Sequence, residues 1–179
     1  MLRLGGILAM AMAIGAGTAA ASEPAGPVTI AFQATGPTLD QPGAGAAGLF
    51  SMAGPFSMTG SFADAGTVRT TYRVAGRHVG ASATLMGVRG IFTISLRGLL
   101  GPRVESGQSA AGRWRLCGGT GAYRHARGSG LWDAVADLPI APAGMTAPTM
   151  RGGFYGRLAR GRTARPPGSL GVPCTSGVM

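Results

Sequence analysis

The clearest structural signal in the chain is the stretch Thr67-Val-Arg-Thr-Thr-Tyr-Arg-Val74. Mostly apolar side chains at every second position alternate there with threonine and arginine. Successive side chains of a β-strand point to opposite faces, so this pattern predicts a strand with one buried and one polar side. The stretch from Val79 to Leu85 repeats the rule. We therefore expect both stretches to belong to an antiparallel sheet around one core.

The same alternation recurs on both sides of this region. Further strands are expected at 28–33, 56–62, 92–97, 113–116, 128–136 and 149–158. The segment 99–112 contains Pro102 and several glycines and is expected to be a connection. About eight short strands without a long helix predict an all-β fold. The simplest architecture is an eight-stranded antiparallel β-barrel, because closure removes exposed edges. A β-sandwich is the alternative, since alternation alone does not separate the two.

The N-terminus has the pattern of a secretory signal peptide. Arg3 supplies a positive charge, an apolar stretch follows, and an Ala-x-Ala sequence ends at Ala21. This order of features is typical of a cleaved export signal. We therefore expect an exported protein, periplasmic or extracellular. The expected organisation is a signal peptide at 1–21, a linker at 22–27, a β-barrel domain at 28–158 and a basic Pro/Gly-rich tail at 159–179.

The chain is strongly basic, with 16 Arg or Lys residues, all of them arginine, against 6 acidic residues. The formal net charge of +10 would attract anionic lipids or polysaccharides of a cell envelope. Nucleic acid is not expected as a partner, because an exported protein rarely meets it and the arginines are spread over several strands.

The cysteines, Cys117 and Cys174, are expected to form a disulfide, because an even number in an oxidising compartment favours pairing. Cys117 shares its strand face with Arg113 and Arg115, which predicts an outward position that a tail running over the barrel could reach. Two free buried thiols are the alternative. A metal site is not expected, because His78 and the cysteines lack the spacing of metal ligands.

The most specific motif is Gly118-Gly-Thr-Gly121, which follows a predicted strand. Glycines permit the backbone to reverse its direction sharply there. Tyr123, just beyond this turn, is expected to place its ring in the core. The motif resembles the dirigent and allene oxide cyclase superfamily, in which a Gly-Gly-(Thr/Ser)-Gly-x-(Phe/Tyr) turn follows a strand. The run Arg124-His-Ala-Arg-Gly128 fits the continuation in plant dirigent proteins. The resemblance implies an eight-stranded barrel with a central cavity. It also implies a homo-oligomer, because members often form trimers.

The resemblance also suggests a catalytic alternative, a cyclase, an isomerase or a dirigent-like protein that steers a reactive hydrophobic intermediate. Dirigent sites combine acidic residues with an arginine in the cavity. Arg127 falls within the matching run, and Asp133 and Glu105 are candidate acidic partners by their proximity in sequence. Catalysis ranks below binding because most charges fall on predicted outer faces. Convergence of Arg127 with either acid inside the barrel would reverse this order. No cofactor is expected.

Our first hypothesis is that the barrel binds a small hydrophobic or aromatic molecule in its lumen without chemistry. It rests on the apolar character of the predicted inner faces. The residues expected to contact the ligand are Tyr72, Phe92, Trp114 and Tyr123. The alternative is that these side chains simply fill the barrel, as eight strands permit. A third hypothesis is an envelope-surface interaction protein that uses its exposed arginines.

Overall fold

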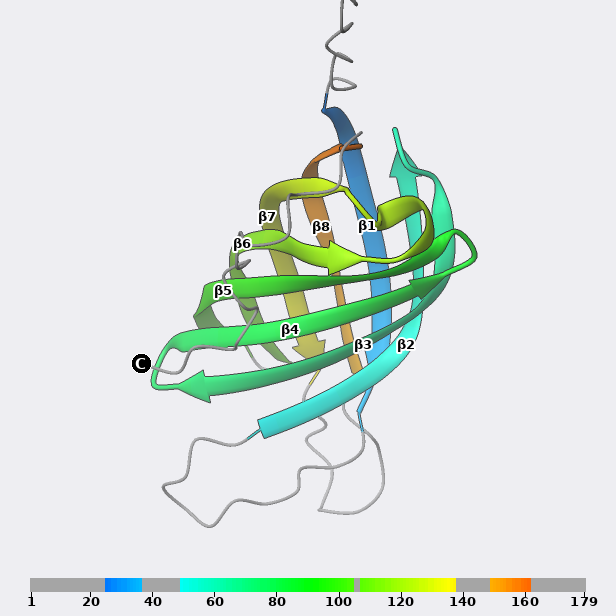
Figure 1. The fold of residues 1–179 in the computed structure, drawn as a ribbon. Coiled ribbons are helices and arrows are strands. Elements are labelled where there is room, and N and C mark those ends of the chain that lie inside the picture. Colours follow the sequence, from blue (N-terminus) through cyan, green and yellow to red (C-terminus); the bar gives the residue numbers. More distant parts are fainter. Residues whose placement is uncertain (1–24, 37–48, 105–106, 138–148, 162–179) are drawn as a thin grey trace, which may run out of the picture.

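The fold is a closed barrel of eight antiparallel strands in sequence order, seen in a computed structural model (Figure 1). The structure describes residues 25–36, 49–104, 107–137 and 149–161. A 3-10 turn, η1 (Gly121–Tyr123), lies between the sixth and seventh strands. The strands are β1 (Gly26–Thr35), β2 (Leu49–Gly60), β3 (Asp64–Ala75), β4 (His78–Gly87), β5 (Gly90–Val104), β6 (Gly107–Gly119), β7 (Arg127–Asp137) and β8 (Thr149–Ala159).

The barrel closes because β1 pairs with both β2 and β8. Ile30 lies opposite Met58 on β2 and opposite Phe154 on β8. Every strand therefore has a partner on both sides, and the described sheet has no free edge. The predicted eight-stranded antiparallel barrel is confirmed, and the β-sandwich alternative is wrong.

The inner faces form one apolar core, as the period-two pattern predicts. On β4 the burial alternates residue by residue, with Val79, Ala81, Ala83 and Leu85 inside. On β3, Arg69 is exposed while its neighbour Val68 is fully buried. The largest fully buried side chains are Tyr123, Phe92, Phe154, Ile30, Leu85, Ile94, Leu158 and Val68.

The segment 99–112 is not the connection that the sequence suggests. Strand β5 continues to Val104 and β6 already begins at Gly107, with Leu99 opposite Ala111. The pairing shifts register between Leu100 and Arg103. This irregularity contains Pro102, which has no N–H to donate to a strand ladder and is tolerated at such positions. Proline and glycine here mark a bulge in a long hairpin.

The Gly118–Gly121 motif reverses the chain, as expected. Gly121 has a φ of +55°, a left-handed conformation that side chains with a Cβ resist. The turn leads into η1, where the Tyr123 side chain has 0 % exposure. In Figure 1, η1 lies at the upper end of the barrel, and it contacts β5 and β6.

The ends of the domain differ slightly from the expected bounds. The barrel begins at Gly26 and ends at Ala159, so part of the predicted linker belongs to β1. The predicted signal peptide at 1–21 and nearly all of the tail at 159–179 lie outside the described residues, and export stays a prediction. Among the described elements, no helix has the length and apolar character needed to span a membrane.

Candidate functional site

One end of the barrel is closed by an aromatic cluster around Tyr123. The centroid of its ring lies 4.4 Å from that of Phe92 and 5.9 Å from that of Phe62. The guanidinium carbon of Arg160 lies 4.9 Å from the centroid of the Phe62 ring, in cation–π geometry. Rings at these separations form favourable contacts beyond their burial. Two predicted ligand-binding residues, Phe92 and Tyr123, thus pack against each other in this closed end.

Asp64 forms hydrogen bonds that connect several segments at this end of the barrel. Its Oδ2 accepts a hydrogen bond from the Tyr123 hydroxyl at 2.8 Å and one from the Arg89 N–H at 3.3 Å. Its Oδ1 accepts from the N–H groups of Ala65 at 2.8 Å and Val88 at 3.0 Å. One carboxylate therefore joins the start of β3, the β4–β5 turn and η1.

The other half of the lumen contains a cavity of about 310 Å³. Its wall comes from β1 and from β3 to β8, near the strand ends farthest from η1. These are the ends from which the chain continues into 37–48, 105–106 and 138–148, outside the described residues. The lining residues are Phe32, Thr70, Tyr72, Val74, Val79, Ala81, Leu96, Leu100, Gln108, Ala110, Trp132, Ala134, Ala136, Met150 and Phe154.

Small residues make room for the aromatic groups of this wall. Gly98 has no side chain, and a Cβ there would lie 2.7 Å from Cζ2 of Trp132. The Trp132 indole N–H donates to the carbonyl of Arg97 at 3.2 Å, which fixes the ring against β5. Phe32 and Phe154 stack with ring centroids 5.0 Å apart. Much of the wall is therefore held by packing and hydrogen bonds within the protein.

Few polar groups reach the cavity. The Gln108 amide donates to the carbonyl of Gly101 at 2.6 Å and is already engaged. Tyr72 is half-buried, and burial raises the pKa of its hydroxyl above the ordinary value of 10.0. The hydroxyl therefore stays protonated at neutral pH. Thr70 is 3 % exposed, and its Oγ1 has no hydrogen-bond partner among the described atoms.

Of the four residues expected to contact a ligand, Tyr72 lines the cavity. Trp114 is buried elsewhere in the barrel, where its indole N–H donates to the carbonyl of Tyr155 at 3.2 Å. Sequence reasoning missed Trp132, the tryptophan that does line the cavity. Its neighbour Asp133 is polar and is therefore expected on the outer face. Because adjacent residues of a strand point to opposite faces, Asp133 was the signal in the sequence that Trp132 points inward.

The expected catalytic residues do not meet in the lumen. Arg127 and Asp133 lie on the exposed face of β7, where burial alternates with Trp132 and Ala134 inside. Asp133 instead borders a hollow on the outer surface, together with Arg77 and Arg151. Glu105 lies outside the described residues. Arg127 and Asp133 therefore do not come together inside the barrel, and the hypothesis of catalysis stays ranked below that of binding.

Cys117 is exposed on β6, on the same face as Arg113 and Arg115, as predicted. Cys174 lies outside the described residues, so the disulfide stays a prediction. No group of three or more His, Cys, Asp or Glu in the described ranges could hold a metal ion.

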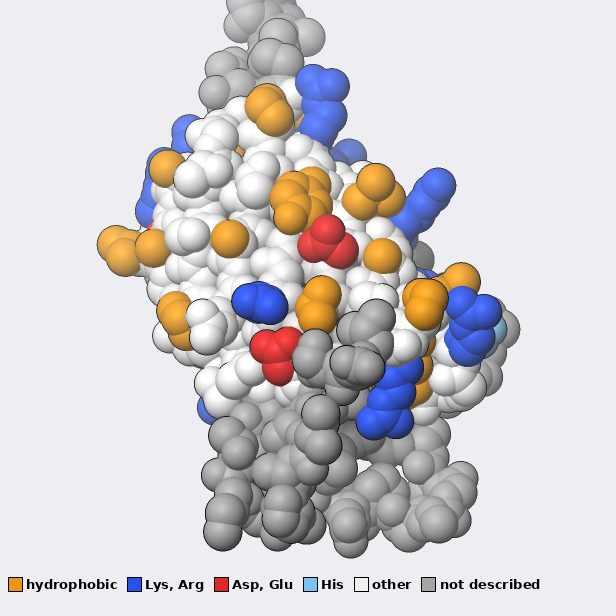
Figure 2. Space-filling model, turned by 180° about the vertical axis from the view of Figure 1, so that it is seen from behind, with side chains coloured by type: hydrophobic (Ala, Val, Ile, Leu, Met, Phe, Trp, Pro, Cys, Tyr) orange, Lys and Arg blue, Asp and Glu red, His pale blue; other side chains and the backbone are white. Residues whose placement is uncertain are grey.

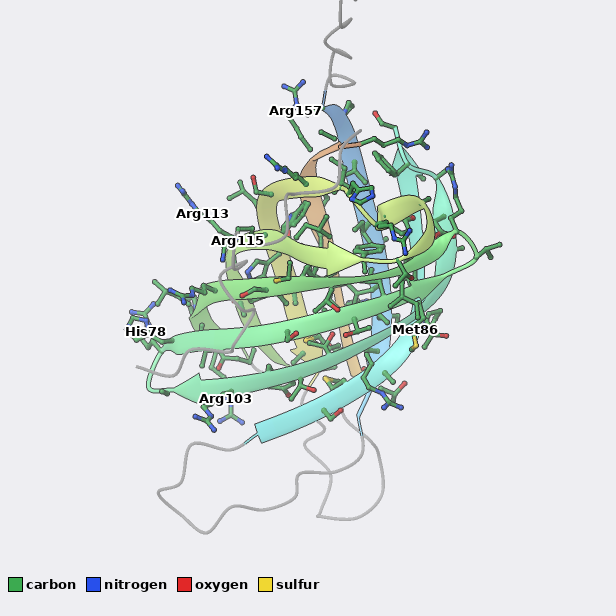
Figure 3. The ribbon with its side chains drawn as sticks, viewed as in Figure 1. His78, Met86, Arg103, Arg113, Arg115 and Arg157 are labelled. Carbon is green, nitrogen blue, oxygen red and sulfur yellow. The ribbon has the colours of Figure 1, made fainter. Side chains whose placement is uncertain are left out.

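The outer surface carries scattered apolar side chains and numerous arginines. On the face seen in Figure 2, hydrophobic side chains are separated by backbone and polar atoms. Met86 lies opposite Ile91, and Leu131 lies opposite Tyr155, so some of these side chains form small pairs. Such small apolar groups are ordinary on protein surfaces and do not define a docking site. Arg113 and Arg115 lie on the outside of β6 (Figure 3). The exposed large hydrophobic residues are Met86, Val88, Ile91, Leu99, Leu131, Val135 and Tyr155.

Comparison with known protein families, curated proteins and solved structures found no match for this chain. The resemblance to the dirigent and allene oxide cyclase superfamily therefore rests on the stretch from Gly112 to Gly128. It stays a prediction, as does the homo-oligomer that it implies. Since one fold serves many functions, the function has to be argued from the cavity itself.

Proposed function

We propose that this barrel binds a small, neutral, hydrophobic molecule in its lumen. The observation that carries the proposal is the cavity of about 310 Å³, whose lining is apolar and aromatic. No charged side chain is among its described lining residues, and burying an unpaired ligand charge there would be costly. Among these described lining residues, the cyclase alternative therefore has no acid–base pair facing a substrate.

The volume of the cavity limits the size of the ligand. An engineered apolar cavity of about 150 Å³ accommodates benzene. The cavity of about 310 Å³ is therefore suited to a molecule of about two fused rings, or an aliphatic one of similar bulk. Such a molecule would replace empty space by contacts with Phe32, Trp132 and Phe154.

Fluorescence energy transfer provides a direct test. The chain has 2 tryptophans, so Trp114→Phe leaves Trp132 in the cavity wall as the single donor. We expect the dye 1-naphthylamine, which has two fused rings and is neutral at pH 7, to quench the fluorescence of Trp132 and to gain emission in a saturable manner. Ala134→Phe, which fills the cavity, is expected to weaken dye binding at least about tenfold, because a ring replaces ligand space.

The matched control is Ala31→Phe, the same substitution on the exposed face of β1. It should leave dye affinity unchanged. Equal affinity in the Ala134→Phe and Ala31→Phe variants would place the dye outside the lumen and contradict the proposal. Urea unfolding of both variants confirms that each is folded before binding is compared.

A second candidate function, recognition of an anionic surface polymer, has an observation of its own. Arg97 on β5 lies directly opposite Arg113 on β6, and both are exposed. Like charges directly opposite each other destabilise a sheet. Strands β4, β5 and β6 contain no acidic residue, and Asp133 on β7 lies opposite Ala111 rather than opposite Arg113. An anionic polysaccharide bound across Arg97 and Arg113 would relieve their repulsion.

Salt elution from immobilised heparin, a linear acidic polysaccharide, tests this candidate. The double variant Arg97→Gln/Arg113→Gln is expected to elute at clearly lower salt than the wild type, because exposed charges act through screened attraction. The control Arg69→Gln/Arg127→Gln removes two exposed arginines elsewhere and has the same net charge. Identical elution of the two double variants would show that only total charge matters and would refute a specific site.

A further inference from the structure

Within the described part of the lumen, one buried side-chain polar group has no hydrogen-bond partner in the fold. Thr70 is 3 % exposed, and its Oγ1 has no partner among the described residues. Nearly all buried polar groups in proteins are hydrogen-bonded, because an unpaired one loses its water without compensation. An unpaired hydroxyl in a cavity wall is a position where a bound water or an oxygen of a ligand would supply the missing hydrogen bond.

The position of Thr70 explains why no side chain satisfies it. In the barrel register it lies between Met52 on β2 and Ala83 on β4, both buried and apolar. Its inward neighbour on the same strand, Val68, is apolar too. Thr70 also lines the cavity, so a molecule bound there can approach its hydroxyl from the lumen.

We propose that the ligand carries a neutral oxygen function, a hydroxyl or a carbonyl, that hydrogen-bonds to Thr70 while its apolar body fills the rest of the cavity. This inference rests on the proposed lumen binding and narrows its ligand class. A charged head group does not fit, because no charged residue is among those that line the described cavity. A pure hydrocarbon would leave Thr70 unpaired.

The test compares naphthalene with 2-naphthol, which differ by one hydroxyl, in calorimetric titrations of the wild-type chain and the Thr70→Val variant. Valine keeps the shape of threonine and removes its hydroxyl. We expect Thr70→Val to weaken the binding of 2-naphthol by about 3- to 10-fold, which corresponds to the loss of one net hydrogen bond. Naphthalene affinity should change by less than about 2-fold, since it makes no such bond.

Two controls make the outcomes decisive. Thr71→Val removes a hydroxyl from the outward face of the same strand and should affect neither ligand. The unfolding midpoint of Thr70→Val without ligand should not fall, since the hydroxyl has no partner to lose. A lower midpoint, or an equal change for both ligands, would overturn the assignment of Thr70. Failure of both ligands to bind the wild type would instead refute lumen binding and this inference with it.

Discussion

Replacing Asp64 with alanine is expected to lower the free energy of unfolding by about 3 kcal/mol, because hydrogen bonds to a charged group contribute about 1.5–3 kcal/mol each. Asp64 accepts four such bonds, from Ala65, Val88, Arg89 and the Tyr123 hydroxyl. Water can replace part of the three exposed backbone bonds. The half-buried bond to Tyr123 has no such replacement, so it dominates the loss.

Urea unfolding at neutral pH measures this effect, with Asp133→Ala as the matched control. Asp133 is exposed on β7, and its removal causes the same change in charge. Exposed substitutions of this kind usually change stability by less than about 0.5 kcal/mol. Similar losses in the two variants would mean that charge, rather than the contacts of Asp64, sets the stability of the closed end.

The pH dependence provides a second measurement of the same contact. Burial raises the pKa of Tyr123 well above 10.0, and the hydrogen bond to Asp64 and its negative charge raise it further. The protonated phenol is thus favoured by folding. The stability that it contributes is complete below the unfolded pKa of about 10 and is lost as pH rises above it. Tyr123→Phe should flatten this alkaline loss between about pH 10 and 12.

The sequence was most informative where arginine or threonine alternates with apolar residues. On β3, Arg69 and Arg73 established which face points outward, and Val68 followed as buried. Closure into a barrel was favoured because it leaves no edge, an argument about the whole sheet rather than about one strand. The long β5–β6 hairpin was missed because Pro102 is tolerated at a bulge, which depends on the partner strand and not on local sequence.

The candidate site was less predictable than the fold. Strand β7 has apolar residues on both faces, with Leu131 exposed and Trp132 buried, so its pattern indicates the inner face only through Asp133. The cavity itself depends on how closely the surrounding side chains meet. Ala81 and Ala134 read as ordinary core residues in the sequence, yet they leave the space that larger residues would occupy. Volume left unfilled is a property of the assembled barrel.

In the glycine motif, alanine substitutions at two neighbouring positions are expected to have opposite effects on stability. Gly119→Ala is expected to destabilise the fold by about 2–3 kcal/mol, the usual cost of forcing atoms into a packed site. A Cβ at Gly119 would lie 2.6 Å from the Tyr123 Cβ and 2.8 Å from the carbonyl oxygen of Ile91. Neither the backbone carbonyl nor the buried tyrosine can move away without opening the closed end of the barrel.

Gly118→Ala is the matched control, because a Cβ there would meet no heavy atom within 4 Å. It is expected to be neutral, or to stabilise the fold by about 0.4–1 kcal/mol by restricting the unfolded chain. Urea unfolding measures both variants, and the near-ultraviolet circular dichroism of Tyr123 reports whether η1 has shifted. Equal stability of the two variants would show that the reversal needs only local chain freedom. A loss confined to Gly119→Ala would show that the motif is required because Tyr123 packs directly against the backbone of β6.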